Sequence, residues 1–479
     1  MILKLIFGVK NFVKNFLNNE IYQENINEVD NEIYQENIYE VDNEIDEKHN
    51  NEVVNAIKFS LILMILRTEF KELKTLLEAV DENTVLNSLS LCIKQIDTEE
   101  GKMLATFLSK NSTLTSFNLC GHYKEWFSNN FGLIGGIAFA DALYKNTTLT
   151  SLCLWNNKLG PEVGKALVNA LYKNTTLTSL NLGYNNLGSE GVKALADVLF
   201  KRGKALADLL YKNTTLRDLS LESNDLGPEV GKALADALCN NTSLTSLNLR
   251  SNHIELSGGC ALIEAFCKNT MLKNLNLRNN NFGVGETVVD ALCKNATLLN
   301  LRSNALGSKE GKVLAVALSK ITTLTSLNLD YNKLGTEGGK AIVNLLRNNS
   351  TLTSLKLDNN ELGPEVGKAL ADVLCKISTL TLLKLGCNKL GSEGGKAFAD
   401  ALCKTTLKFL SLRHNDLGSG VKALADALCK NSTLTSLDLQ GNFIGLEGGK
   451  ALADTLYYFT EAHFTDKVIL VIVVRVRVE

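Results

Sequence analysis

The chain has 479 residues, more than one compact hydrophobic core usually contains, so its length predicts several domains or one repeat array. A formal net charge of −2 and an apolar fraction of 45% argue against a typical nucleic-acid binder and against a disordered protein. The sequence has only three prolines, which favours long runs of regular structure. No apolar stretch approaches the roughly 20 residues that a helix needs to span a bilayer.

Residues 1–18 are predicted to form an amphipathic helix. Lys4, Lys10 and Lys14 interrupt its apolar run and no small-residue cleavage site follows, so the segment differs from a secretory signal peptide. Polar residues share one face of this helix, and isoleucine, leucine and phenylalanine fill the other. The sequence leaves three roles open: weak contact of residues 1–17 with a membrane surface, contact with a partner, or a cap on the following domain.

Residues 19–52 form an acidic segment with a tandem copy, NEIYQENINEVD followed by NEIYQENIYEVD. The segment contains twelve acidic residues and a single lysine, Lys48. This composition predicts a solvated tether or, alternatively, an interaction tail. Residues 53–85 come next. The apolar pattern of IKFSLILMILRTEFKELKTLLEAV predicts a helical cap over the N-terminal end of the repeats that follow.

A sequence repeat covers residues 86–456. The segment LTSLCLWNNKLGPEVGKALVNALYKNTT, which begins at Leu149, recurs along this span. One asparagine marks its register, usually every 28 residues, at positions 157, 185, 224, 252, 280, 304, 332, 360, 388, 415 and 442. Lys94 and His122 are assigned to the same position in two earlier, degenerate copies, which gives about thirteen units. The second unit carries about seven extra residues, and steps of 24, 27 and 39 residues interrupt the regular spacing.

Each unit predicts a short strand followed by a helix. In LTSLNLRSN, Leu247 and Leu249 alternate with polar residues, which is the period of a half-buried strand. The amide of the following Asn252 can satisfy backbone groups that water cannot reach. A Leu-Gly bend and an amphipathic helix complete the unit. One strand and one helix cannot bury their own apolar faces, so the units are predicted to stack into an α/β solenoid.

Residues 457–479 contain VILVIVVRVRVE, a strongly strand-like sequence. A solenoid needs a cover at each end, because its terminal units would otherwise expose the apolar core. The sequence leaves open whether this segment extends the last sheet edge as a C-terminal cap or forms a tail.

The consensus L-x-x-L-x-L-x-x-N-x-L-G-x-x-G-x-x-x-L-x-x-x-L at 28 residues resembles the ribonuclease-inhibitor-like leucine-rich-repeat family. It is similar to the repeat regions of NOD-like receptors and Ran GTPase-activating proteins. The resemblance implies a horseshoe with a parallel β-sheet on the concave face and α-helices on the convex face. It also implies a non-enzymatic scaffold or sensor that binds another protein through the concave face. The alternative is a regulator that activates a small Ran-like GTPase.

The residue after the second strand leucine is predicted to point outward from the concave face. Arg250, Arg278 and Arg302 follow one another in this position, and neighbouring strands lie about 4.8 Å apart, so they form a basic ladder. Such a ladder can bind a carboxylate or phosphate. Alternatively, the arginines extend into solvent, or Arg250 pairs with Glu222 and Arg302 with Asp330. The candidate partner-binding residues are Trp155, Glu222, Arg250, Arg278, Arg302, Asp330, Asp358 and Arg413.

The sequence indicates no catalytic site, no cofactor and no metal site. The histidines fall in unrelated repeat positions, and no Cys-x-x-Cys or Cys/His cluster occurs. Six of the eleven cysteines fill one repeat position. Units lie on the order of 10 Å apart there, too far for a disulfide, so free thiols in a reducing compartment are predicted. We expect a cytoplasmic monomer that binds a protein and no nucleic acid.

Overall fold

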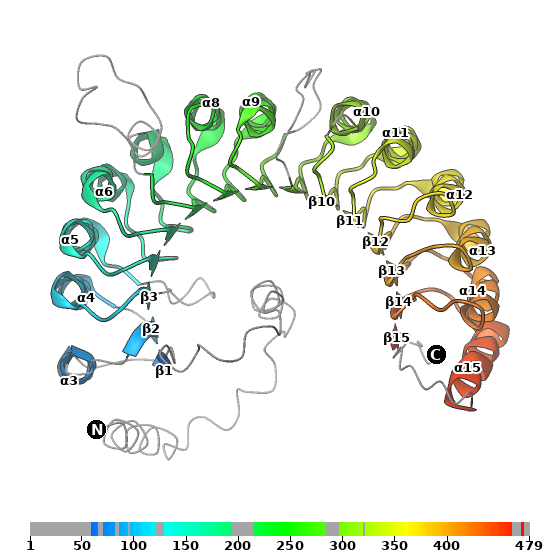
Figure 1. Cartoon of the computed structure of the whole chain (residues 1–479), viewed down its shortest axis with the longest axis horizontal. Helices are drawn as coiled ribbons and strands as arrows, with labels where there is room; N and C mark the ends of the chain where they lie inside the picture. Colours follow the sequence, from blue (N-terminus) through cyan, green and yellow to red (C-terminus); the bar gives the residue numbers. More distant parts are fainter. Residues whose placement is uncertain are drawn as a thin grey trace, which may run out of the picture.

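In the computed structural model the chain forms a curved solenoid (Figure 1). The structure describes residues 59–65, 70–81, 86–93, 96–119, 129–193, 214–282, 297–319, 321–461 and 471–473. The predicted helix over residues 1–18 and the predicted tether over residues 19–52 therefore lie outside the described residues. None of the described helices is long and apolar enough to cross a membrane.

The described strands form one parallel sheet that lines the inner side of the arc (Figure 1). Their order in the sheet equals their order in the chain, which confirms the predicted α/β solenoid. Thirteen of these fifteen strands, β2 to β14, fall within the predicted repeat span. The strands are β1 (Phe59–Ile65), β2 (Leu86–Ile93), β3 (Ser116–Asn118), β4 (Ser151–Cys153), β5 (Ser179–Asn181), β6 (Asp218–Ser220), β7 (Ser246–Asn248), β8 (Asn274–Asn276), β9 (Leu298–Asn300), β10 (Ser326–Asn328), β11 (Ser354–Lys356), β12 (Leu382–Lys384), β13 (Phe409–Ser411), β14 (Ser436–Asp438) and β15 (Val471–Val473).

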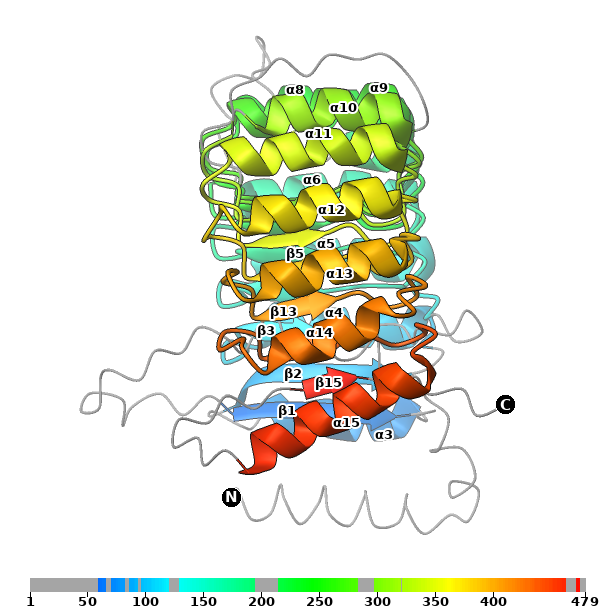
Figure 2. The same cartoon turned by 90° about the vertical axis from the view of Figure 1, so that its right-hand side faces the viewer.

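The described helices cover the outer side of the sheet and stack beside one another (Figure 2). In α12 the buried residues Val366, Leu370 and Leu374 recur every four positions and form the face that packs on the strands. A Cβ atom on Gly231 of α8 would lie 2.9 Å from the Cα atom of Gly258 in α9, so glycine lets these helices approach closely. The helices are α3 (Phe70–Asp81), α4 (Thr98–Lys110), α5 (Gly132–Lys145), α6 (Pro161–Lys173), α8 (Gly227–Leu238), α9 (Glu255–Lys268), α10 (Gly307–Leu318), α11 (Gly335–Asn348), α12 (Gly363–Leu374), α13 (Gly391–Leu402), α14 (Gly420–Leu428) and α15 (Gly445–Glu461).

The repeat asparagines form a ladder of hydrogen bonds through the turns that follow the strands. In one such turn, Asn332 accepts a hydrogen bond from the backbone N–H of Asn304 at 3.0 Å. Its Nδ2 atom donates to the carbonyl oxygens of Leu301 at 2.8 Å and Leu329 at 2.9 Å. The preceding residue, Tyr331, has a left-handed backbone with a φ of 58°. The asparagine side chain therefore satisfies buried turn groups in two units at once, which confirms its predicted role.

The ladder corrects the predicted register of the second unit: the assignment of His122 to the asparagine position is wrong. Asn129 occupies that position, since its Oδ1 atom accepts from the backbone N–H of Ile96 at 3.0 Å and its Nδ2 atom donates to Asn157 at 2.9 Å. The step from Asn129 to Asn157 is the regular 28 residues, so the extra residues precede this asparagine. The amide of asparagine carries an acceptor oxygen and an N–H donor group on one carbon, so a single side chain makes both hydrogen bonds. His122 itself lies outside the described residues.

The N-terminal cap is only partly helical, which corrects the prediction for residues 53–85. Phe59–Ile65 form strand β1, which pairs in parallel with β2, and helix α3 follows. A short apolar run such as FSLILMI fits a strand or a buried helix equally well by its periodicity. The edge of β2 offers backbone hydrogen-bond partners, which favours the strand. The cap therefore continues the solenoid with another strand and helix.

At the C-terminal end, strand β15 pairs in parallel with β14, with Leu437 opposite Ile472. The described part of residues 457–479 thus extends the sheet, one of the two alternatives left open by the sequence. Helix α15 continues to Glu461, beyond the predicted end of the repeats at residue 456. The other domain limits drawn from the sequence stay predictions.

The prediction of free thiols holds at four of the shared repeat positions and fails at one. Cys239, Cys375, Cys403 and Cys429 are free thiols. Cys267, in the same position at the end of α9, is disulfide-bonded. The distance argument assumed units of equal length, whereas the unit after Cys267 has the shortened step of 24 residues between its asparagines. The uniform spacing that forbids a disulfide therefore does not apply there.

Replacing one ladder asparagine should cost far more stability than replacing an exposed asparagine. Asn360→Ala removes the acceptor for the buried backbone N–H of Asn332. It also removes one of two donors to the carbonyl oxygens of Leu329 and Leu357, which keep hydrogen bonds from Asn332 and Asn388. A buried group left without a partner costs about 1–3 kcal/mol, so the orphaned N–H of Asn332 should lower the free energy of unfolding by about that amount. Urea denaturation followed by circular dichroism measures this loss. Asn348→Ala, at the exposed end of α11, is the matched control, and an equal loss in both variants would contradict the role of the ladder.

Candidate functional site

One row of side chains follows the strands on the concave face, and it holds the residue after the second leucine of each unit. A local hydrogen bond fixes the backbone of this row. Asn248 accepts a hydrogen bond at 3.1 Å from the backbone N–H of Arg250, and Asn276 and Asn300 hold the next two arginines in the same way. The structure places all eight candidate residues in this concave row: Trp155, Glu222, Arg250, Arg278, Arg302, Asp330, Asp358 and Arg413.

Towards the N-terminal end of the concave row, Trp155 lies against Tyr184 of the next unit. The ring centroids are 4.8 Å apart and the ring planes are inclined by 58°. Gly183, the residue before Tyr184, holds the row position beside Trp155. A Cβ atom on Gly183 would lie 2.7 Å from Cδ1 of Trp155. The glycine therefore makes room for the indole. Because both aromatic side chains are partly exposed, the pair forms an aromatic surface rather than a core contact.

Arg250 is held by an acid of the preceding unit. Its Nη1 atom lies 3.3 Å from Oε1 of Glu222, whose other carboxylate oxygen accepts a hydrogen bond from Asn248 at 3.2 Å. The sequence left open whether Arg250 extends into solvent or pairs with Glu222, and the structure shows the pair. Arg278 stands between Arg250 and Arg302 in the concave row, so three consecutive units carry a positive charge.

Arg302 makes two weaker contacts with the following unit. Its Nη1 atom lies 4.0 Å from Oδ2 of Asp330, at the outer limit of an ion pair. Its guanidinium carbon lies 4.8 Å from the ring centroid of Tyr331, which is within the range of a cation–π interaction. The Nε atom of Arg302 is buried and has no hydrogen-bond partner. The contacts therefore orient the guanidinium group and engage only part of its donor set.

Asp330 and Asp358 are neighbouring carboxyl groups, and each residue is only 3% exposed. Oδ1 of Asp330 accepts a hydrogen bond from the backbone N–H of Asp358 at 2.7 Å. Burial, and secondly the charge of Asp358, raise the pKa of Asp330 to about 6. The hydrogen bond and the positive charges of Arg302 and Lys356 oppose this rise but do not cancel it. Asp330 therefore titrates close to neutral pH.

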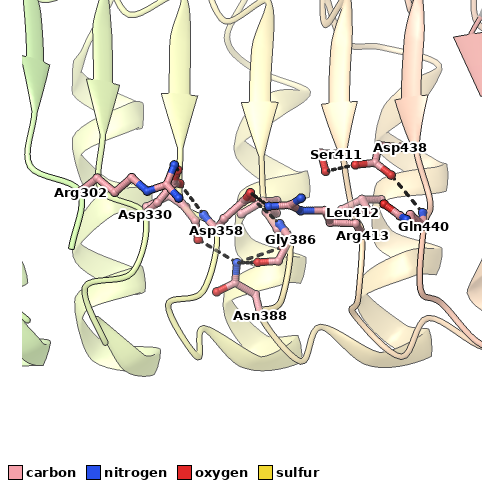
Figure 3. A network of polar contacts seen from close by, with 12 residues as sticks. Arg302, Asp330, Asp358, Gly386, Asn388, Ser411, Leu412, Arg413, Asp438 and Gln440 are labelled. Atoms are coloured by element: carbon pink, nitrogen blue, oxygen red, sulfur yellow. Dashed lines mark hydrogen bonds and ion pairs between the residues drawn. The ribbon is translucent and has the colours of Figure 1, made fainter. Parts of the chain in front are cut away.

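Arg413 crosses a whole unit to reach Asp358 (Figure 3). Its Nη2 atom lies 3.0 Å from Oδ2 of Asp358. The unit between them contributes Gly386, whose backbone N–H donates to Oδ1 of Asp358 at 2.6 Å. A Cβ atom on Gly386 would lie 2.6 Å from Cγ of Arg413, so only a glycine leaves this path open. Arg302, Asp330, Asp358 and Arg413 together are termed the Arg–Asp network.

The concave surface from β7 to β13 is basic as a whole. Its strand residues and concave-row residues carry six basic and two acidic side chains, a net charge of +4 (six minus two). The entire chain, in contrast, has a net charge of −2. We term this surface the basic concave face. Its charged residues are Arg250, Arg278, Arg302, Asp330, Lys356, Asp358, Lys384 and Arg413.

The sequence places Gly183 and Gly386 in the concave row, but sequence reasoning missed their steric role and the aromatic contacts of Tyr184 and Tyr331. A signal was present, because glycine interrupts a row that otherwise carries long side chains. Within the described residues, no cluster of three or more histidine, cysteine, aspartate or glutamate side chains could hold a metal ion.

Eight segments of the chain match the family of leucine-rich repeats: residues 173–196, 212–235, 240–262, 320–343, 348–371, 376–399, 403–425 and 430–453. They follow the alternation of strand and helix that the structure shows. The chain is a leucine-rich-repeat protein.

Solved structures resemble this leucine-rich-repeat protein at low identity. The complex of TLR13 with ssRNA13 is 19% identical, with a TM-score of 0.46 over 79% of this chain and 46% of that chain. LegL7 from Legionella pneumophila is 22% identical, with a TM-score of 0.40 over 68% of this chain and 95% of that chain. Actin-binding site 2 of leiomodin-1 is 21% identical, with a TM-score of 0.26 over 32% of this chain and 91% of that chain. No curated protein sequence matches the chain. Structural similarity at this level supports no inference about function.

Asp330 should make the stability of this leucine-rich-repeat protein depend on pH. Folding raises its pKa from 3.8 to about 6, so the folded state binds the proton more tightly and stability falls as pH rises through this window. Asp330→Asn keeps the acceptor for the backbone N–H of Asp358 and removes the titration. As pH rises from about 4 to about 8, the free energy of unfolding of the wild type should fall by up to about 3 kcal/mol more than that of the variant.

Urea denaturation at the two pH values measures this difference. Asp400→Asn, at an exposed position of α13, is the control and should keep the pH dependence of the wild type. The same pH dependence in wild type and Asp330→Asn would show that burial of this carboxyl does not control stability.

Gly386→Ala should break the contact between Arg413 and Asp358 by filling the path of the arginine. We expect a loss of about 1–3 kcal/mol, because Asp358 then stays buried without its charged partner. In an Arg413→Ala background the same change should cost less, about 0.5 kcal/mol, since only the 3.2 Å approach of the new Cβ atom to Oδ1 of Asp358 remains. A double-mutant cycle from urea denaturation measures this coupling. Equal losses in both backgrounds would mean that the glycine acts through its backbone alone.

Proposed function

We propose that this leucine-rich-repeat protein is a non-enzymatic scaffold that binds an acidic segment of another protein on the basic concave face. Repeat proteins of this kind generally offer a concave surface to protein partners. The observation that carries the proposal is the net charge of +4 between β7 and β13 on a chain whose total charge is −2. Opposite charge on a partner raises the rate of encounter and suppresses wrong partners.

The positions of the arginines support recognition of carboxylates. Strands lie about 4.8 Å apart, so Arg250, Arg278 and Arg302 present their side chains at regular short intervals. Arg250 engages Glu222 and Arg302 engages Asp330 through the Nη1 atom, and both side chains stay partly exposed. A guanidinium group has five N–H donors, so these pairs orient the arginines without using all donors.

The aromatic pair of Trp155 and Tyr184 supports a second contact area nearer the N-terminal end. Large aromatic and arginine side chains provide most of the energy of many protein interfaces. Two χ angles position a tryptophan, so little conformational entropy is lost when a partner covers it. A partner that spans β4 to β13 would therefore meet an aromatic area first and a basic area next along the same sheet.

A triple variant tests the proposal. Arg250→Gln, Arg278→Gln and Arg302→Gln remove three positive charges, whereas glutamate at these positions would also repel Glu222 and Asp330 and disturb the fold. A partner recovered by affinity capture should bind this variant at least tenfold more weakly, which is about 1.4 kcal/mol. Calorimetric titration measures the Kd. Binding to the wild-type protein should also weaken as the salt concentration rises.

The matched control removes the same charge from the convex side. Arg347→Gln, Lys376→Gln and Lys404→Gln change exposed basic residues near the C-terminal ends of α11, α12 and α13. Their combined variant should keep the Kd within about twofold of the wild type. An equal loss of affinity in the two triple variants would place the binding surface outside the basic concave face.

Other functional expectations stay predictions from the sequence. These are the sensor role, the activation of a small Ran-like GTPase, the cytoplasmic location, the monomeric state and the absence of nucleic-acid binding. Acceleration of GTP hydrolysis by a substoichiometric amount of this protein would establish the GTPase-activating alternative.

A further inference from the structure

The outer faces of the helices carry a repeated pair of opposite charges near the helix N-terminus. A glutamate and a lysine three residues apart form each pair, as in α6, where Glu162 and Lys165 are 3.2 Å apart. Lysines also reach the next helix, as Lys340 of α11 does towards Glu365 of α12 at 2.9 Å. We term these pairs the Glu–Lys belt: Glu99–Lys102, Glu162–Lys165, Glu229–Lys232, Glu337–Lys340 and Glu393–Lys396.

Helix α5 replaces the charged pair with two isoleucines. Ile134 and Ile137 hold the positions of glutamate and lysine, and they are 57% and 39% exposed. Leu133 and Tyr144, at 48% and 52% exposed, extend this apolar surface along the helix. Leu133, Ile137 and Tyr144 project within about 40° of one another around the helix axis, so they form one outward stripe. The four residues are termed the α5 patch.

The α5 patch is a local departure and lies outside the surface of the proposed function. The helices on either side keep their charged pairs, Glu99–Lys102 in α4 and Glu162–Lys165 in α6. The patch is on the convex side, whereas the proposed partner-binding surface is the concave sheet (Figure 1). Contiguous exposed apolar side chains in a polar surface mark an interaction site.

We propose that the α5 patch binds residues 1–18 of the same chain. This segment has an amphipathic sequence whose apolar face consists of isoleucine, leucine and phenylalanine. The size of the patch favours such an occupant. Four side chains expose on the order of a few hundred Å², well below the roughly 800 Å² that each partner buries in a stable complex. One short helix covers this area, whereas a second copy of the chain would need a larger contact.

Distance also favours residues 1–18. Helices α3, α4 and α5 are consecutive neighbours at the N-terminal end of the arc, so α3 and α5 lie about 20 Å apart at 8–10 Å per helix. Forty residues separate residue 18 from β1, and a chain of that length can reach up to roughly 130 Å, so it is long enough to span this distance.

The test rebuilds the Glu–Lys belt on α5. Ile134→Glu with Ile137→Lys gives α5 the pair that α4 and α6 already carry, so the variant should fold. Hydrogen exchange of the full chain, read by mass spectrometry, should show residues 1–18 exchanging at least tenfold faster in this variant than in wild type. Val316→Lys is the matched control, because it places a charge on another apolar residue, 61% exposed on α10. It should leave the exchange of residues 1–18 unchanged.

Vesicles of phosphatidylcholine and phosphatidylserine distinguish this docking from binding to a membrane surface. A docked segment hides its apolar face, so the wild-type chain should bind these vesicles at least tenfold more weakly than the Ile134→Glu, Ile137→Lys variant. Equal vesicle binding by the two proteins would overturn the proposal. Unprotected residues 1–18 in the wild type, or protection that persists in the variant, would overturn it as well. Protection that grows with protein concentration would assign the α5 patch to a second copy instead.

Discussion

Turn backbone groups between a strand and its helix lose access to water as soon as the next unit stacks on them. The repeat asparagine satisfies them, because one amide can bond to carbonyl and N–H groups in two units. This requirement tolerates changes elsewhere in a unit. The short step from Asn280 to Asn304 keeps its ladder hydrogen bond at 2.8 Å, and β8 and β9 stay in register. Helix length and outward side chains can therefore vary from unit to unit, while the asparagine recurs from Asn129 to Asn442.

The concave face shows how that freedom is used. The residues of the concave row differ in charge and size from unit to unit, so the repeat itself does not set their identity. Burying Asp330 beside Asp358 is unfavourable, and the surrounding arginines and backbone N–H groups offset only part of this cost. Such groups add little to stability. These acids instead position the arginines, because each guanidinium group of the Arg–Asp network has a defined neighbour and a limited range of orientations.

Much of the fold could be derived from the sequence, since leucines and asparagines repeat at a fixed spacing and stacking is their only way to become buried. The candidate residues of the concave row also followed from that spacing, as did the pairs of Arg250 and Arg302 with acids of adjacent units. The register at Asn129 did not follow from the spacing, because the extra residues of the second unit hide which side chain makes the ladder hydrogen bonds. Phe59–Ile65 has no period that separates a strand from a helix. The reach of Arg413 across Gly386 depends on the absence of a side chain, which a list of charged residues does not reveal.

The contact of Arg413 with Asp358 has a consequence for how this array could change length. Repeat arrays gain or lose whole units when similar stretches of a gene recombine. An added unit between β11 and β13 would move the two charges a further strand apart, beyond the length of an arginine side chain. Loss of the unit between them would remove Gly386 and place Asp358 and Arg413 in adjacent units. The contact of Arg413 with Asp358 therefore depends on the present order of the units of β11, β12 and β13, and a unit inserted among them would break it.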